Sequence, residues 1–381
     1  MALSLASPSL SYDLLRDYSG QHFFDGWDFY GSWDNLTLSA VWWLNETEAT
    51  AEHLAYVNDA GRAIIRVDNT TNVPQGQDRN TIRLTTKDSY DFGSLWVFDA
   101  THLPYGCSVW PAFWAKGPNW PFDGEIDIVE GINMMSANQM AIHTTDGCTT
   151  NSSIVQTGTI GFTDCGTGSG CTVHETKPNS FGAGFAAAGG GVWATQFDVA
   201  GVFMWFWSRA DVPAELTQNQ TSIDISTWGT PSAAFPVTPT CNLTQFFTPQ
   251  QLVLDIALCG DWAGVQGIYQ STGCSGTCNV AGPGSPAYDN AWFEINYVRA
   301  YTTGASTPTS TSSTTLTTSP TAGSGDATTT SVATVITTAA GSTRTSGSDQ
   351  SSSSSGAPRW HARSAGALGL VCAVLGSLLL V

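Results

Sequence analysis

Residues 12–301 alternate between short apolar or aromatic runs and breaks made of Gly, Asn, Asp and Pro. Such runs are typical of β-strands, because β-branched and aromatic side chains pack well on a pleated sheet and the break residues favour turns. Long apolar runs at helical spacing are missing. The pattern predicts strands at residues 63–67, 81–85, 95–98, 125–129, 202–207, 252–257 and 292–301.

These strands predict an all-β fold in which residues 12–301 form one β-sandwich domain. The region has no linker-like break and no internal repeat, and all-β domains of this length are common. Residues 1–11 stay unassigned, because they hold neither a basic segment nor an uninterrupted apolar run of the kind found in a signal peptide. We expect a truncated or misassigned start here, because the other end of the chain predicts export.

The composition changes after Tyr301. Of residues 302–356, 33 of 55 are Ser or Thr and none is aromatic or Cys, so we expect a disordered, O-glycosylated stalk. Residues 357–381 contain a polar spacer and then an apolar run that ends the sequence, which is typical of a glycolipid (GPI) anchor signal. A transmembrane helix is the alternative, but the apolar run is at the short limit for a span. We therefore expect a secreted protein, held by its anchor at the outer face of the plasma membrane or in the cell wall.

Cysteines and glycosylation motifs agree with export. Eight of the nine cysteines lie in the predicted domain, and neither Cys-x-x-Cys nor a Cys/His cluster with zinc spacing occurs, so we expect disulfides whose pairing stays open. The ninth, Cys372, lies in the apolar tail. Sequons for N-glycosylation occur at Asn35, Asn45, Asn69, Asn151, Asn219 and Asn242.

Charge and composition narrow the ligand class. The chain has 13 Lys and Arg against 31 Asp and Glu, for a net charge of −18, so we expect no nucleic acid partner. Only 12% of residues are charged, whereas Trp, Asn, Thr and Gly are frequent. A neutral ligand held by ring stacking and hydrogen bonds suits this composition better.

The segment Glu125-Ile-Asp127-Ile-Val-Glu130 concentrates acidic groups in a predicted strand. Side chains alternate along a strand, so Glu125 and Asp127 share one face. Glu130 would fall on the other face unless a β-bulge near Ile128 or Val129 adds one residue and restores it to the acidic side. Crowding of three carboxylates then keeps one of them protonated near neutral pH while another stays charged.

A charged carboxylate beside a protonated one is what retaining glycoside hydrolysis requires, with the two about 5–5.5 Å apart. Five residues of flat strand span roughly 16 Å, so the bulge, the sheet curvature and the side-chain reach must bring the two groups together. In this interpretation Glu125 forms the glycosyl ester, Glu130 is the acid and then the base, and Asp127 orients Glu125.

The same spacing also fits a solvated strand edge, the start of a helix or a calcium site. The flanking residues favour the catalytic interpretation. Gly124 allows close backbone approach, and three tryptophans offer stacking surfaces for sugar rings, although Trp is also common in protein cores: Trp110, Trp114 and Trp120.

Five segments of the sequence resemble glycoside hydrolase family 16, specifically the fungal endo-1,3(4)-β-glucanases or laminarinases. They are residues 110–130, residues 138–148, the opening segment 23–29, the Cys-Gly-Asp-Trp turn at 259–262 and the closing strand 291–301. The likeness covers about residues 12–301. It implies a curved β-jelly-roll sandwich with an open cleft, with Glu125 as nucleophile, Asp127 as its helper and Glu130 as acid/base. It also implies sugar contacts by Trp110, Trp114, Trp120, His143, Arg83 and Trp262.

For His143 a purely structural hydrogen-bonding role is the alternative. The sequence departs from the family at Gln196 and Phe197, where Glu-Trp is common, and at Ala186 and Ala187, where a more polar pair is usual. We expect these changes to alter the affinity of the sugar subsites.

We therefore expect a retaining endo-β-glucanase that hydrolyses internal 1,3 or mixed 1,3/1,4 linkages of β-glucan. It would act as a monomer without a cofactor, while a structural metal stays an open question. A cell-wall transglycosylase using the same acids is the alternative. Chitin–glucan transglycosylases of the family usually have the unbulged Glu-x-Asp-x-Glu spacing, so Glu130 at this position favours hydrolysis. A binding module without turnover is a third possibility, but it does not need three clustered acids.

Overall fold

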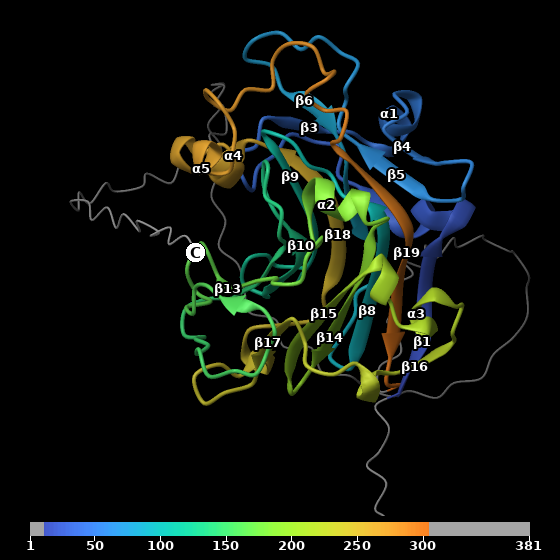
Figure 1. Ribbon diagram of the computed structural model, residues 1–381, viewed down its shortest axis with the longest axis vertical. Helices are drawn as coiled ribbons and strands as arrows, with labels where there is room; N and C mark the ends of the chain where they lie inside the picture. The colour runs from blue at the N-terminus through green and yellow to red at the C-terminus, as the bar shows by residue number, and fades with distance from the viewer. Residues whose placement is uncertain (1–10, 305–381) are drawn as a thin grey trace, which may run out of the picture. The chain divides into compact units, whose positions relative to one another are not determined.

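The computed structural model describes residues 11–304, which fold into two antiparallel sheets and one small parallel sheet (Figure 1). The nine-stranded sheet runs in the order β16 (Ser222–Asp224), β1 (Ser11–Ser19), β19 (Trp292–Thr302), β8 (Ser94–His102), β14 (Gly191–Asp198), β15 (Gly201–Ser208) and β17 (Ala233–Pro236), and β5 (Ala63–Arg66) joins β19 to β4 (Ala55–Val57).

The eight-stranded sheet contains the acidic strand. Its order is β12 (Thr159–Ile160), β13 (Cys171–His174), β11 (Gln139–His143), β10 (Glu125–Glu130), β9 (Val109–Lys116), β18 (Gln251–Leu258), β7 (Arg83–Thr86) and β2 (Trp27–Phe29). The two-stranded parallel sheet pairs β3 (Val41–Trp43) with β6 (Arg79–Thr81).

Helices are short and lie in the connections. The α-helices are α1 (Glu46–Ala51), α2 (Gly182–Ala187), α3 (Ala214–Thr217), α4 (Gly260–Ala263) and α5 (Gln266–Ser271), and the 3₁₀ turns are η1 (Gly20–Gly26), η2 (Arg209–Asp211), η3 (Ile225–Thr227) and η4 (Leu243–Gln245). Within residues 11–304, none of these helices has the length and apolar character needed to cross a bilayer.

The two large sheets pack face to face around the main apolar core. Phe98 of β8 stacks on Phe113 of β9 with ring centroids 4.5 Å apart, so strands of both sheets meet through aromatic side chains. Trp193 of β14 lies 6.2 Å from Phe98, and Phe185 of α2 packs on Trp193 at 5.2 Å. Burial of such large rings is a main source of the stability of the sandwich.

The nine-stranded sheet is also covered on its other face. There Leu95 and Val97 alternate with the core residues of β8, and they pack under Leu216 of α3 and Trp228 after η3. Because side chains on both faces of β8 are buried, its sequence is an almost continuous apolar run. On the eight-stranded sheet, acidic side chains together with tryptophans line a pocket.

The predicted all-β sandwich is confirmed, and each predicted run overlaps a strand. One prediction needs correction: residues 81–85 do not form one strand. Thr81 ends β6, which pairs with β3, whereas Arg83 begins β7 of the eight-stranded sheet, so the chain changes sheet at the buried Ile82. The stalk and the anchor signal, predicted for residues 302–381, lie outside the described residues apart from the end of β19 and residues 303–304.

The expectation of disulfides is confirmed. All eight cysteines of the domain are paired, in a pattern that the sequence left open: Cys107–Cys274, Cys148–Cys241, Cys165–Cys171 and Cys259–Cys278. Cys107–Cys274 ties the segment that contains α4 and α5 to the connection before β9, and Cys259–Cys278 closes that segment on itself.

Candidate active site

The acidic strand β10 contains the β-bulge that its spacing predicts. Opposite β9, Asp127 pairs with Trp114 and Val129 with Phe113, so Ile128 is the extra residue. The side chains of Ile128 and Val129 are both buried in the main core. Glu130 consequently returns to the face shared by Glu125 and Asp127.

Asn138 holds the bulge in place. Its Oδ1 accepts a 2.9 Å hydrogen bond from the backbone N–H of Glu130, and its Nδ2 donates a 2.8 Å bond to the carbonyl of Ile128. The side chain is fully buried, and its own N–H donates to Ser180 Oγ at 3.0 Å. One amide therefore satisfies two backbone groups that a regular ladder would have paired with β11.

The three acids face a pocket together with the three tryptophans predicted to bind sugar. The indole N–H of Trp120 donates to Glu125 Oε2, and that of Trp110 donates to Glu130 Oε1 at 2.8 Å. Each of these tryptophans therefore lines the pocket and fixes one carboxylate through its N–H.

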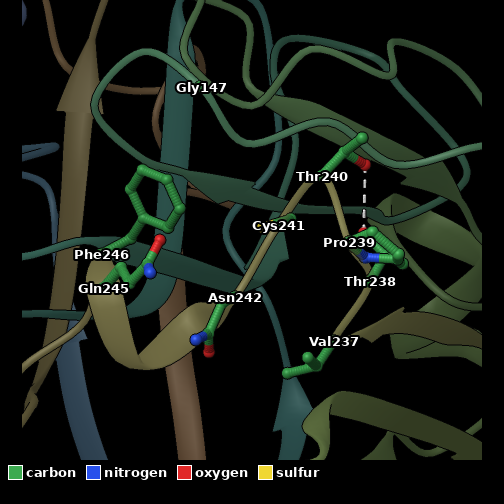
Figure 2. Close-up of a pocket in the computed structure, with 9 residues that line it drawn as sticks. All are labelled: Gly147, Val237, Thr238, Pro239, Thr240, Cys241, Asn242, Gln245 and Phe246. Carbon is green, nitrogen blue, oxygen red and sulfur yellow. Dashed lines mark hydrogen bonds between the residues drawn. The ribbon is translucent and has the colours of Figure 1, made fainter.

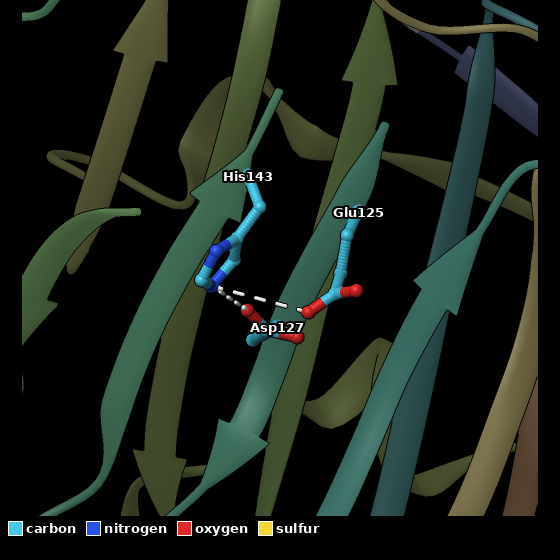
Figure 3. Close-up of side chains that lie close together, drawn as sticks. All are labelled: Glu125, Asp127 and His143. Carbon is cyan, nitrogen blue, oxygen red and sulfur yellow. Dashed lines mark ion pairs between the residues drawn. The ribbon is translucent and has the colours of Figure 1, made fainter. Parts of the chain in front are cut away.

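His143 lies on β11 directly opposite Glu125 and closes the acidic cluster (Figure 3). Its Nε2 lies 3.2 Å from Asp127 Oδ2 and 3.9 Å from Glu125 Oε1. Burial by itself lowers the pKa of His143, but the carboxylates of Asp127, Glu125 and Glu130 outweigh it and raise this pKa to about 9. The imidazole is thus positively charged at neutral pH.

Burial is the main cause of the raised pKa values of Glu125 and Glu130, the first and last acids of β10 (the outer acids). It raises the pKa of Glu125 to about 7, assisted by the charge of Asp127 and opposed by His143, Trp120 and Arg83. Burial also raises the pKa of Glu130 well above its usual range, again with Asp127 adding to it. Near neutral pH the site can therefore hold a proton on one outer acid and a charge on the other.

One donor atom from each of Glu125, Asp127 and His143 lies within 4.8 Å of the others, a spacing that could suit a shared metal ion. The raised pKa of His143 shows that the surrounding carboxylates favour a positive charge here, and a proton on the imidazole supplies it. We interpret this group as a cluster of ion pairs in which the imidazolium supplies the positive charge.

The remaining predicted sugar-contacting residues occupy different places. Arg83 on β7 lines the pocket, and its guanidinium lies 5.2 Å from the ring centre of Trp114. Trp262 in α4 is half-buried and is not part of the pocket lining; it packs edge-on against Trp110, with ring centroids 5.5 Å apart. Trp262 therefore supports a wall residue.

Several pocket residues were missed by the sequence analysis. Asp255 on β18 pairs across the sheet with Arg83 and accepts a 2.9 Å bond from Trp114 Nε1; burial raises its pKa to about 6. The sequence signal that could have identified Asp255 is that it is a single carboxylate in an otherwise apolar predicted strand. Asp34, Leu36, Thr37 and Trp43 reach the pocket from an irregular segment and from β3, for which the local sequence offers no comparable signal.

The expected effect of Gln196 and Phe197 on sugar subsites is not supported. Both lie on β14, in the sheet opposite the pocket. Phe197 is buried and stacks on Phe92 at 4.3 Å, and Gln196 Nε2 donates to Tyr12 Oη at 2.8 Å. These residues stabilise the sandwich.

A second hollow lies beside η4 (Figure 2). Its wall combines Gly147 with residues on either side of Cys241, including Thr238 and Thr240, whose hydroxyls hydrogen-bond at 3.1 Å. The lining contains no carboxylate, histidine, lysine or arginine, so this hollow lacks the groups needed for acid–base chemistry.

Comparison with known proteins agrees with this geometry. The family model described as "XgeA-like, catalytic GH16 domain" matches residues 27–301. A probable endo-1,3(4)-beta-glucanase of Aspergillus flavus is 33% identical over 81% of this chain and 48% of its own length. The chain therefore spans about half the length of this curated relative.

Two solved structures are also similar. Laminarinase 16A of Phanerochaete chrysosporium, solved with β-glucans in its donor and acceptor sites, is 33% identical with a TM-score of 0.73, over 76% of this chain and 99% of that one. An elongating GH family 16 beta-1,3-glucosyltransferase is 35% identical with a TM-score of 0.71, over 76% of this chain and 100% of that one. On the combined evidence of the bulged acidic strand, the sandwich and these matches, the chain belongs to glycoside hydrolase family 16.

Proposed function

We propose that the protein is a retaining endo-β-glucanase that hydrolyses internal 1,3 or mixed 1,3/1,4 β-glucosidic linkages. The observation that carries the proposal is that Glu125 and Glu130 lie on one face of β10 and line one pocket. Each of them accepts an indole N–H, and each has a raised pKa. The relatives named endo-1,3(4)-beta-glucanase support the choice of substrate.

The roles of the two acids follow from their surroundings. Glu125 has the better support for negative charge, since His143, Trp120 and Arg83 all lower its pKa, and it would attack the anomeric carbon. Glu130 would hold its proton and give it to the departing sugar oxygen. Having given up its proton, Glu130 stays ionised because the glycosyl ester has neutralised Glu125. It can then take a proton from the water that attacks the ester and releases Glu125.

Asp127 and His143 would position Glu125. The imidazolium lies beside both carboxylates, so it holds Asp127 and offsets the repulsion between Asp127 and Glu125. Trp110, Trp114 and Trp120 line the pocket; Trp110 and Trp114 are largely buried, so Trp120 offers the most open ring on which a glucose unit can stack. The three roles of Glu125, Asp127 and Glu130 stay predictions until variants are measured.

The test is the release of reducing ends by the purified protein from laminarin and from mixed-linkage β-glucan, with the anomeric form of the first product followed by NMR. We expect β-configured product and loss of activity in Glu125→Gln. Glu215→Gln is the matched control, because Glu215 also accepts an indole N–H, at 2.9 Å from Trp228, but lies over the other sheet. Inverted product, or an active Glu125→Gln, would contradict the proposal.

A transglycosylase is the second candidate, favoured by the similarity to the elongating glucosyltransferase. The chemistry differs only in whether water or a sugar hydroxyl resolves the ester. Addition of a labelled acceptor oligosaccharide to the same assay separates the two: labelled longer products without a net gain of reducing ends identify transfer. Binding of oligosaccharide without either product would identify a binding module.

We further propose a secreted, monomeric protein tethered by a GPI anchor. Support comes from the sequence of residues 302–381 and from the four disulfides, which are typical of oxidising compartments. Release of the protein from intact cells by phosphatidylinositol-specific phospholipase C tests the anchor, and light scattering tests the oligomeric state.

A further inference from the structure

Two exposed tryptophans are paired beside the small parallel sheet. Trp33 and Trp42 form an antiparallel bridge, and the adjacent backbone hydrogen bond joins the Trp43 N–H to the Ser32 carbonyl at 2.9 Å. Directly opposed residues in such a bridge project to the same face. Their exposed fractions are 57% and 40%, unusually high for two neighbouring indoles.

The opposite face of the same segment belongs to the active-site pocket. Asp34 and Trp43, which follow the two exposed tryptophans, are buried and line the pocket. Asp34 accepts hydrogen bonds from the N–H groups of Thr37 at 3.1 Å and Ser39 at 2.9 Å, and from Trp43 Nε1 at 3.4 Å. The exposed pair is therefore held on a fixed backbone, so a ligand would bind without having to order it.

The neighbourhood of the pair is polar and acidic. Trp42 pairs across the parallel sheet with Asn80, whose Nδ2 donates to Glu52 at 2.8 Å. Beyond Asn80 lies a shallow groove whose lining includes Thr71, Gln77 and Asp78 and contains no lysine or arginine. Together with the net charge of −18, these acids disfavour an anionic ligand.

Tyr30 links the pocket to the segment that contains Trp33. Tyr30 is 37% exposed, and its ring lies 5.1 Å from the guanidinium of the pocket residue Arg83. Its hydroxyl donates to Asn35 at 2.7 Å, in the segment that contains Trp33. Tyr30 therefore contacts both a pocket residue and the segment that contains Trp33.

We propose that Trp33 and Trp42 form a secondary binding platform for the neutral β-glucan polymer, outside the catalytic pocket. The ligand class rests on the proposed function. Sugar rings stack on flat indoles, and their hydroxyls can bond to the polar groups next to Trp42. The platform holds a distant part of the chain and raises the effective concentration of linkages at the acids.

The experiment compares a long soluble β-1,3-glucan with a pentasaccharide of the same linkage. In Trp33→Ala/Trp42→Ala we expect kcat/KM on the polymer to fall about 3- to 10-fold relative to kcat/KM on the pentasaccharide. Phe162→Ala is the matched control, because Phe162 is 61% exposed and lies outside the pocket and the platform. The single variant Trp33→Ala, at the more exposed position, tests the platform should the double variant not fold.

Affinity electrophoresis in gels containing the polymer separates this proposal from the proposed function, because it needs no turnover. In the Glu125→Gln background, we expect the platform variant to be retarded less than its parent. Equal retardation, or an equal loss in Phe162→Ala, would overturn the platform even if hydrolysis is intact. Loss of binding to phosphatidylcholine vesicles, or loss of self-association in solution, with unchanged polymer retardation, would likewise overturn it in favour of another occupant.

Discussion

The proton on Glu130 and the charge on Glu125 can be tested separately. Because an acid is needed only for a poor leaving group, Glu130→Gln should still release dinitrophenolate from an activated aryl β-glucoside in a rapid burst. Its turnover of polymer should fall about 10²- to 10⁴-fold. Glu125→Gln should give no burst with either substrate, since no ester forms. Stopped-flow absorbance measures the burst, and a burst in Glu125→Gln would contradict the assigned roles.

His143 should set the acid limb of the pH profile. Its positive charge lowers the pKa of Glu125, so His143→Asn should raise that pKa and move the acid limb of kcat/KM to higher pH. His102→Asn is the matched control, since His102 is also buried but stacks on Trp292 at 3.8 Å, away from the acids. A reduced rate with an unmoved limb would mean that His143 has only a structural role.

At the scale of elements, the bulge in β10 determines the side on which Glu130 lies. Asn138→Ala should leave the Glu130 N–H and the Ile128 carbonyl buried without partners, at a cost of about 2–4 kcal/mol in unfolding free energy. We expect kcat to fall with little change in KM, because the acid is displaced while the stacking surfaces remain.

Asn133→Ala provides the matched control for this prediction. Asn133 is equally buried and also bridges backbone groups, accepting from the Ser108 N–H at 2.8 Å and donating to the Ala263 carbonyl at 3.1 Å. Thermal melts and kinetics of both variants should show similar destabilisation but a loss of kcat in Asn138→Ala alone. Equal losses of kcat would show that the effect is general destabilisation.

The bulge could be predicted because the spacing from Glu125 to Glu130 violates strand alternation, a purely local signal. The sequence did not show in the same way which tryptophans face the pocket and which are buried in the core. Trp110 and Trp114 face the pocket, whereas Trp193, on a strand of the other sheet, is fully buried. Which face of a strand is open depends on the layer that covers it, and this depends on distant segments such as the one containing Trp228.

The conformation of the irregular segment from Asp34 to Thr37 could not be predicted from local sequence either, because it also depends on tertiary contacts. Its shape depends on hydrogen bonds to Asp34, including one from Trp43 nine residues away, and not on a periodic pattern. Disulfide pairing is equally non-local: Cys107 and Cys274 are 167 residues apart in the sequence. Local patterns therefore predicted the strands and the acids, while the pocket walls depended on tertiary contacts.

At the scale of the whole molecule, the catalytic cluster should make stability depend on pH. Glu125 has a folded pKa of about 7, above its unfolded value, so its contribution to stability is fully present below about pH 4.5 and is lost as the pH rises toward 7. Glu130 acts in the same direction. His143, with a folded pKa of about 9, loses its contribution between about pH 6.5 and 9.

We therefore expect these three groups to cause no change of the melting temperature with pH below about pH 4.5 and to lower it steadily from there toward pH 9. Glu125→Gln removes a charge that is costly to bury, so it should melt above the wild type at pH 8, with a gain of about 3 kcal/mol in unfolding free energy, and close to it at pH 4.5. Calorimetry at the two pH values measures the difference, with Glu215→Gln to show the effect of removing an indole-bonded carboxylate elsewhere in the protein. A Glu125→Gln variant that is less stable than the wild type at pH 8 would mean that the charged cluster stabilises the fold, contrary to the burial argument.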